Sequence, residues 1–275
     1  KSDGASLYAT RDLAALKYRT RRYKPQSIFY VVGNEQSLHF DQVFAVAKRA
    51  GFVGKENLEH LKFGAILGED GQKFATREGR LIRLEDVLTE AVTRARAVVD
   101  QKNSKLTPRL KAKVAEVVGI GAVKYNDLSQ NRHTDITFSW DRMLSLDGNS
   151  APYLQYSYVR LVSIIRKSQA EAGGARKKSE TKLDLTLATE ADTAMVRLLV
   201  RYPEAILRAA EERGPHLLAQ YLYDVATGVN SYYQSTPVLK AGNGLRAMRL
   251  EIVRTSAEVL KRGLALLGIG VVEQM

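Results

Sequence analysis

The chain has 275 residues, enough for one large or two ordinary domains, and 45% hydrophobic and 26% charged residues indicate a globular protein. Lysine and arginine outnumber aspartate and glutamate by 42 to 30, so the net charge is +12 and favours a polyanionic partner. The absence of cysteine excludes disulfides and thiolate metal sites and fits a reducing, cytoplasmic compartment. The longest apolar run, residues 264–272, is too short to span a bilayer, and no signal-peptide pattern opens the chain, so no membrane partner is expected.

Strand and helix patterns alternate over the first hundred residues. ASLYA predicts a strand that ends near Tyr8, and Thr10 is then the cap of a helix through RDLAALKYRTRR. The elements that follow are a buried strand at 27–32, a helix at 37–51 ended by Gly51, a strand at 61–67 and a glycine- and charge-rich loop at 68–80. Another helix begins near Arg83.

This order of elements predicts a parallel sheet with crossover helices, the arrangement of α/β folds. About three strands are visible, which is fewer than a doubly wound sheet contains. We therefore expect the first part of the chain to form part of such a sheet.

Beyond about residue 100 the strand patterns fade and helical periodicity replaces them. Thr107 is a helix cap, and Pro108 takes the first helical position. Helical patterns then cover 149–170, 189–200, 204–213, 215–234 and 244–267. Two of these carry apolar stripes, formed by Leu218, Tyr221, Leu222, Val225 and Val229 and by Val253, Leu260, Leu264 and Leu267. A helical bundle is expected, with residues 171–182 as a mobile loop between its helices.

Tyr8 and Asp12 stand four residues apart at the start of the first predicted helix. In one interpretation they are local features, with Asp12 complementing the helix dipole. In the other, the phenol and the carboxylate line a pocket for a cationic ligand. Base rates for polar residues at helix starts favour the first interpretation when the stretch is taken alone.

Gln36 and His39 follow the buried strand 27–32 and open the next helix. Ligands of open parallel sheets bind at the carboxyl ends of the strands, near helix N-termini, so these two residues occupy a ligand-facing location. The alternative is that Asn34 and Ser37 are loop and cap residues and that His39 is a surface side chain.

The loop 68–80 has three glycines together with Lys73, Thr76 and Arg77. Such a loop can bring cations and a hydroxyl onto a triphosphate. It is not a P-loop, because the pattern GxxxxGK[ST] is absent, and GxGxxG is absent as well. The alternative is a solvated turn.

Two further stretches combine cations with tyrosines. KYRTRRYK at 17–24 has five cations and two tyrosines, and is either a solvated helix face or a phosphate-contacting patch. APYLQYSYVRL places Tyr153, Tyr156 and Arg160 on one helical face, where they suit either stacking on unpaired bases or core packing.

Five ordered blocks of the chain resemble the C-terminal portion of the arginyl-tRNA synthetases. These blocks are DGASLYATRDLA, VVGNEQSLHFDQVFAVAKRAGF, GQKFATREG, the long block GAVKYNDLSQNRHTDITFSWDRMLSLDGNSAPYLQYSYVRL and the ending LLGIGVVEQM. The resemblance implies the C-terminal half of a Rossmann-type class I catalytic domain with connecting helices at 1–118, and a helical-bundle anticodon-binding domain at 119–275. It also implies that Trp140 is structural and packs the junction of the two domains.

The implied activity is that of an arginine–tRNA ligase, which forms arginyl-adenylate from ATP with magnesium and transfers the arginine to tRNA(Arg). The implied partners are tRNA(Arg), arginine and ATP, and members of the family are often monomeric. Tyr8, Asp12 and Gln36 match the arginine pocket. A carboxylate accepts two hydrogen bonds from the planar fork of a guanidinium, which a lysine does not offer.

The remaining roles follow from the same resemblance. Lys73, Thr76 and Arg77 stand where class I synthetases carry the KMSKS signature, with Thr76 in place of the second lysine, and His39 is implied as a neighbour of the ATP or its ribose. Tyr233 and Met275, with Tyr153, Tyr156 and Arg160, are implied to contact tRNA.

The His-x-Gly-His motif of class I synthetases is absent, because the four histidines stand in no such setting. We therefore expect a fragment that does not make arginyl-adenylate alone. The alternatives are a non-catalytic tRNA-binding module and an unrelated basic α/β protein.

Overall fold

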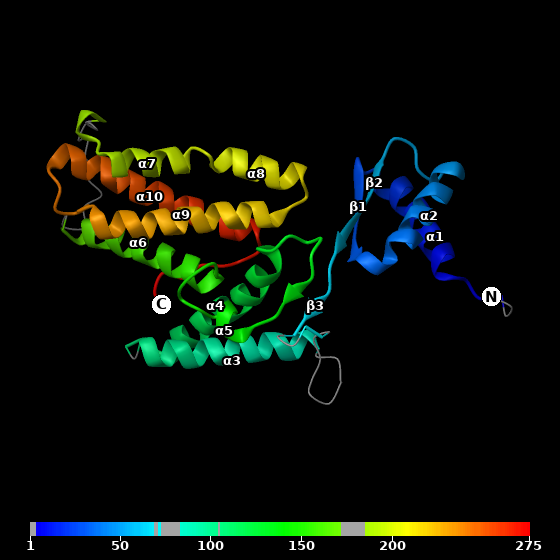
Figure 1. Cartoon of the computed structure of the whole chain (residues 1–275), viewed down its shortest axis with the longest axis horizontal. Helices are drawn as coiled ribbons and strands as arrows, with labels where there is room; N and C mark the ends of the chain where they lie inside the picture. Colours follow the sequence, from blue (N-terminus) through cyan, green and yellow to red (C-terminus); the bar gives the residue numbers. More distant parts are fainter. Residues whose placement is uncertain (1–3, 69–70, 73–82, 104, 172–184) are drawn as a thin grey trace. The chain divides into compact units, whose positions relative to one another are not determined.

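The computed structural model describes residues 4–68, 71–72, 83–103, 105–171 and 185–275 (Figure 1). The chain divides into two compact units. The N-terminal unit consists of residues 1–67 and 132–136, and the helical unit consists of residues 68–131 and 137–275. The loop expected at 171–182 lies outside the described residues except for Glu171.

The N-terminal unit has the α/β order expected from the sequence. Its elements are α1 (Tyr8–Tyr23), β1 (Ser27–Gly33), the 3₁₀ turn η1 (Asn34–Gln36), α2 (Ser37–Arg49), β2 (Asn57–Phe63) and β3 (Ile66–Leu67). β1 and β2 pair in parallel from Ser27 opposite Asn57 to Gly33 opposite Phe63. β3 pairs with the short β4 (Ile136–Thr137). The predicted strand 27–32, the helix that follows it and the parallel pairing are therefore confirmed.

The prediction of a strand at residues 5–9 with Thr10 as cap is wrong. α1 already begins at Tyr8, Leu7 is its N-cap residue in extended conformation, and Thr10 lies inside the first turn. The reason is the helical spacing of Ala9, Leu13 and Leu16, which pack with Val43 and Ala47 of α2.

The strand expected at 61–67 is longer and divided. β2 starts four residues earlier, at Asn57, and ends at Phe63, and β3 begins only at Ile66. The Gly64 N–H donates to the Arg132 carbonyl instead of continuing the ladder of β2. A Cβ on Gly64 would collide with the backbone of Thr134, so this crossing requires glycine.

The helical unit begins with two long helices that pack against each other, α3 (Leu84–Lys102) and α4 (Pro108–Leu128). Thr107 caps α4 by accepting from the Leu110 N–H at 3.3 Å, and Pro108 is the first helical residue, as predicted. The remaining helical elements are α5 (Trp140–Met143), α6 (Ala151–Glu171), η2 (Leu185–Leu187), α7 (Glu190–Leu199), α8 (Tyr202–Glu211), α9 (Pro215–Ser235) and α10 (Asn243–Leu266). The five helices expected between 149 and 267 are all present, with ends within about two residues.

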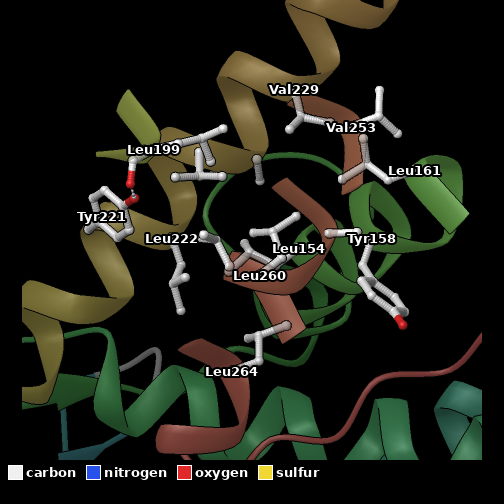
Figure 2. Packing of buried hydrophobic residues seen from close by; sticks show 14 of the residues in the cluster. Leu154, Tyr158, Leu161, Leu199, Tyr221, Leu222, Val229, Val253, Leu260 and Leu264 are labelled. Atoms are coloured by element: carbon white, nitrogen blue, oxygen red, sulfur yellow. Dashed lines mark hydrogen bonds between the residues drawn. The ribbon is translucent and has the colours of Figure 1, made fainter. Parts of the chain in front are cut away.

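The core of the helical unit is formed by the two apolar stripes seen in the sequence. Figure 2 shows Leu222, Val229, Val253, Leu260 and Leu264 packed together with residues of α6. α9 and α10 each contact α6 and each other, while α7 and α8 follow one another along α9 (Figure 1). The predicted bundle and its core stripes are confirmed.

A buried ion pair joins three of these helices. Asp192 of α7 and Arg249 of α10 are both almost completely buried, with Nε to Oδ1 at 3.1 Å and Nη2 to Oδ2 at 3.2 Å. The Tyr232 hydroxyl of α9 donates to Oδ1 at 2.6 Å, and Thr189 completes a capping box with Asp192. Burial opposes ionisation, but the hydrogen bonds from Arg249, Tyr232 and Thr189 outweigh it and lower the pKa of Asp192 to about 2.

We predict that Arg249→Met destabilises the helical unit by about 3–5 kcal/mol, because the Asp192 carboxylate would stay buried without its cation. Denaturant unfolding followed by the fluorescence of Trp140, the single tryptophan, measures this. The matched control is Arg262→Met, which breaks an exposed pair with Glu258 and is expected to change the stability far less. Equal losses in the two variants would contradict the prediction.

The same pair predicts an acid dependence of stability. Because the pKa of Asp192 is lowered from about 3.9 in the unfolded chain to about 2, its ionised form stabilises the fold above pH 4, and this contribution disappears as the pH falls toward 2. The difference in unfolding free energy between the protein and Asp192→Asn should be constant from pH 7 to about pH 5 and shrink below pH 4. A difference that is unchanged at pH 2.5 would refute the assignment.

Candidate functional site

Asp12 and His39 face each other across the two helices of the N-terminal unit. Asp12 is the fifth residue of α1 and His39 the third residue of α2, and His39 Nε2 lies 2.7 Å from Asp12 Oδ2. The pair forms because η1 turns the chain from the end of β1 directly into α2, and α2 packs on α1 through Leu16 and Val43. Both side chains are partly buried, at 35% and 26% exposure.

The position of Asp12 in α1 argues against the helix-dipole interpretation. No acidic residue lies in the first turn of α1, so Asp12 is placed too deep in the helix to complement the dipole of its N-terminus. Its carboxylate instead lies beside the segment that leaves the carboxyl end of β1. Within the part of the chain that the structure describes, Oδ2 is held by His39, and Oδ1 has no hydrogen-bond donor.

The other residues of the expected pocket come from the same two segments. Tyr8 lies one helical turn before Asp12 and is 81% exposed, so its phenol is available to a ligand. Gln36 ends η1, is exposed, and precedes His39 by three residues. His39 is neither a free surface residue nor isolated, because its ring also contacts Phe40 edge-on. Lys73, Thr76 and Arg77 lie outside the described residues.

A second cluster lies between α6 and α9 in the helical unit. The guanidinium of Arg160 lies over the ring of Tyr156, 4.6 Å from its centroid, and over the ring of Tyr233 at 5.5 Å. Arg160 also donates to Asn230 Oδ1 at 3.0 Å, and the Asn230 amide donates to Ser157 Oγ at 3.0 Å. Tyr233 keeps 47% of its surface exposed. The cluster therefore presents one aromatic face beside a cation that is fixed from two helices.

Three of the five residues expected to contact tRNA are brought together here, and two are not. Tyr153 lies one turn before Tyr156 and packs against Tyr223, with ring centroids 5.8 Å apart. Met275 packs on a different cluster formed by α3 and α4, and its carbonyl accepts from Asn103 at 3.3 Å.

Asn230 is a member of the cluster that the sequence reasoning missed. It lies 70 residues from Arg160, so no local spacing connects them. Its position three residues before Tyr233 on the same helical face was the available signal.

Trp140 has a packing role within the helical unit. Its ring meets Phe138 edge-on at 4.8 Å and lies under the guanidinium of Arg94 at 4.9 Å.

Among the described residues, no group of three or more His, Cys, Asp or Glu side chains is arranged to hold a metal ion. None of the described helices combines the length and the apolar composition that crossing a membrane requires.

Comparison with known families identifies both parts of the chain. Residues 1–140 match the family described as tRNA synthetases class I (R), catalytic domain, and residues 154–275 match the DALR anticodon binding domain. The fold is therefore that of a class I tRNA synthetase catalytic fragment followed by a helical anticodon-binding domain, as expected. Within that class, the chain belongs to the arginyl-tRNA synthetase family.

Individual relatives agree with this assignment. The arginine–tRNA ligase of Hahella chejuensis is 46% identical over 276 residues, a match that covers 100% of this chain and 47% of that protein. The solved arginyl-tRNA synthetase of Thermus thermophilus superposes with a TM-score of 0.84 at 30% identity, covering 100% of this chain and 50% of the other. The Plasmodium falciparum arginyl-tRNA synthetase gives 0.80 at 25% identity, covering 100% of this chain and 46% of the other. The chain spans about half the length of the curated relatives it matches.

Proposed function

We propose that this chain is part of an arginine–tRNA ligase. The arginine carboxylate attacks ATP to form arginyl-adenylate and release pyrophosphate, and a terminal hydroxyl of tRNA(Arg) then displaces AMP. The observation that carries this proposal is the Asp12 carboxylate, which is held on one oxygen by His39 at the carboxyl end of β1.

Asp12 is proposed as the residue that recognises the arginine side chain. A guanidinium presents parallel N–H donors, and the free Oδ1, with the remaining lone pair of Oδ2, matches this fork. Tyr8 adds an apolar wall and a hydroxyl, and Gln36 adds an amide oxygen. A neutral analogue of arginine would leave the carboxylate poorly paired, which is the basis of discrimination.

His39 is proposed to orient Asp12. An imidazole that donates from Nε2 to Oδ2 would fix the carboxylate plane and leave Oδ1 facing the ligand. A contact of His39 with ATP or its ribose is a second proposal. Steady-state kinetics distinguishes this role from the orientation of Asp12.

The nucleotide would be contacted by the segment around residue 73. Lys73 and Arg77 are proposed to stabilise the charge that develops on the transferring phosphates, with Thr76 as a hydroxyl donor. Magnesium would enter with ATP and neutralise phosphate charge.

The Tyr156–Arg160–Tyr233 cluster is proposed as a tRNA contact. The exposed face of Tyr233 suits stacking on an unpaired base, and Arg160 suits the adjacent backbone. Tyr153 and Met275 are proposed as further contacts on the strength of the family resemblance.

We also propose that the protein is a monomer in the cytoplasm. The catalytic part of the chain is proposed to end near residue 118, within α4.

A non-catalytic tRNA-binding module is the second candidate for the chain alone. It is favoured by the fact that the Tyr156–Arg160–Tyr233 cluster is complete within the chain, whereas the chain spans about half of each relative. The two candidates differ in small-molecule binding, because a ligase site binds arginine and ATP together.

We predict that Asp12→Ala raises the KM for arginine at least about 100-fold, because a charged hydrogen-bond partner of the guanidinium is lost. The measurement is ATP–pyrophosphate exchange in a protein that also carries the length of the relatives that this chain does not span. The control is Glu35→Ala, which removes an exposed carboxylate from η1 next to the same strand end and should leave the KM unchanged.

The same assay decides the role of His39. If His39 orients Asp12, His39→Ala raises the KM for arginine and leaves the KM for ATP unchanged. His39→Asn, which keeps a donor, should raise the KM for arginine less. A rise in the KM for ATP alone would assign His39 to the nucleotide. An unchanged arginine KM in Asp12→Ala would remove the proposed pocket altogether.

We further predict that Tyr233→Leu weakens binding of tRNA(Arg) by about 5- to 150-fold, the range expected for loss of one aromatic stacking platform. Tyr233→Phe keeps the ring and should bind like the unaltered chain. Fluorescence anisotropy with labelled tRNA(Arg) and the 275-residue chain measures both. Equal affinity of the Leu and Phe variants would rule out stacking at this position.

A further inference from the structure

The basic run 17–24 on α1 has no role in the proposed function, and the structure separates its five cations into two groups. Lys17 lies over the ring of Phe52 at 5.0 Å. Arg19 donates to the Tyr30 hydroxyl at 3.1 Å, and its guanidinium lies over the ring of Tyr30. These two cations have packing partners within the N-terminal unit. The others, Arg21, Arg22 and Lys24, are exposed at the C-terminal end of α1.

The end of α2 adds two more cations at the same place. The Thr20 hydroxyl of α1 donates to the carbonyl of Phe52 at 2.9 Å, and the Phe52 N–H donates to Ala47 in the last turns of α2. The C-terminal ends of the two helices therefore adjoin, and Lys48 and Arg49 of α2 are exposed there. Neither residues 13–34 nor residues 42–55 contain an aspartate or glutamate.

We call this surface the α1–α2 basic end, formed by Tyr18, Arg21, Arg22, Tyr23, Lys24, Lys48 and Arg49. Within the described ranges, none of its five cations forms an ion pair with a carboxylate. Cations in a last helical turn complement the helix dipole, which accounts for Arg21 and Arg22 of α1 and for Lys48 and Arg49 of α2. It does not account for Lys24, the C-cap residue, which lies beyond the last residue of α1.

The dipole also does not account for the tyrosines. Tyr18 and Tyr23 are 59% and 66% exposed, and their rings meet edge-to-face with centroids 6.2 Å apart. A pair of large rings held in water beside unpaired cations matches the chemistry of a nucleic-acid surface, in which arginine and lysine contact phosphates and aromatic faces stack on unpaired bases.

We propose that the α1–α2 basic end binds RNA, with Arg21, Arg22 and Lys24 on the phosphate backbone and the Tyr18–Tyr23 pair against an unpaired base. This contact belongs to the N-terminal unit and is additional to the Tyr156–Arg160–Tyr233 cluster. The inference takes from the proposed function only the identity of the RNA, a tRNA.

The test compares two triple variants of the 275-residue chain that change the net charge equally. Arg21→Gln/Arg22→Gln/Lys24→Gln removes unpaired cations of the basic end. Arg197→Gln/Arg208→Gln/Arg262→Gln removes cations that already pair with Glu190, Glu212 and Glu258. Affinity for tRNA(Arg) is measured by anisotropy as a function of NaCl concentration, and circular dichroism and the thermal midpoint verify that both variants are folded.

For the basic-end triple variant we expect at least about a tenfold loss of affinity in low salt. The slope of log affinity against log salt should fall by about 2–3, because each lost phosphate contact removes about 0.7–0.9. The control triple variant should keep its slope. A basic-end variant that matches the control in both affinity and slope overturns the proposal.

A second RNA separates this inference from the proposed function. A stem-loop without the anticodon arm should lose binding in the basic-end variant but not in Tyr233→Leu, whereas whole tRNA should respond to both. With whole tRNA, a loss of affinity in Tyr233→Leu alone supports the proposed tRNA contact and overturns this inference. With whole tRNA, a loss in the basic-end variant alone supports this inference and overturns the proposed contact at Tyr233.

Two further arms test the tyrosines and the class of partner. Tyr18→Leu/Tyr23→Leu should weaken RNA binding while Tyr18→Phe/Tyr23→Phe does not, and equal binding by the two pairs overturns the stacking contact. Vesicles of phosphatidylserine and phosphatidylcholine serve as a competing polyanion. If the basic-end variant loses vesicle binding but keeps RNA binding, the surface is a membrane contact and the proposal is wrong.

Discussion

The buried carboxylate of Asp192 is the interaction on which the arrangement of the helical unit depends. Removing a carboxylate from water is costly, and the cost is met here by a two-point pair with Arg249, a hydroxyl from Tyr232 and the capping box of Thr189. Each partner comes from a different segment. The carboxylate is therefore satisfied only when α7, α9 and α10 are aligned in one particular way.

This alignment also determines what α9 presents at its surface. Tyr232 is directed to Asp192, so its chain neighbour Tyr233 is directed elsewhere on the helix, to the guanidinium of Arg160 on α6. Tyr232, which donates to the buried pair, and Tyr233, which belongs to the proposed tRNA contact, are thus consecutive residues of α9. A change that rotates α9 would disturb both, which is why the stability of a Tyr233 variant has to be compared with its RNA affinity.

In the N-terminal unit, the two halves of α1 are proposed to present side chains of opposite charge to their ligands. The first half of α1 has Tyr8 and Asp12 on one face, with Asp12 held by His39, and is proposed to offer an acceptor for a cation. The second half has the exposed cations and tyrosines of the α1–α2 basic end, and offers donors for an anion. Leu16 and Thr20 anchor the helix between them, one in the apolar core and the other on the carbonyl of Phe52.

The helices, the parallel pairing, the apolar stripes and the family could be predicted from the sequence, because these depend on local periodicity or on ordered motifs that survive as a linear pattern. The start of α1 could not be predicted, because ASLYA fits a strand pattern. Only the packing of α1 against α2 shows that the helix already begins at Tyr8. Only the folded structure shows that His39 holds Asp12 and that Asn230 and Tyr233 meet Arg160. It also shows that Arg19 contacts Tyr30, whereas Arg21 and Arg22 form no ion pair among the described residues. These contacts join side chains 11 to 73 residues apart, and their partners are selected by how the helices are rotated against each other, which no spacing along the chain records.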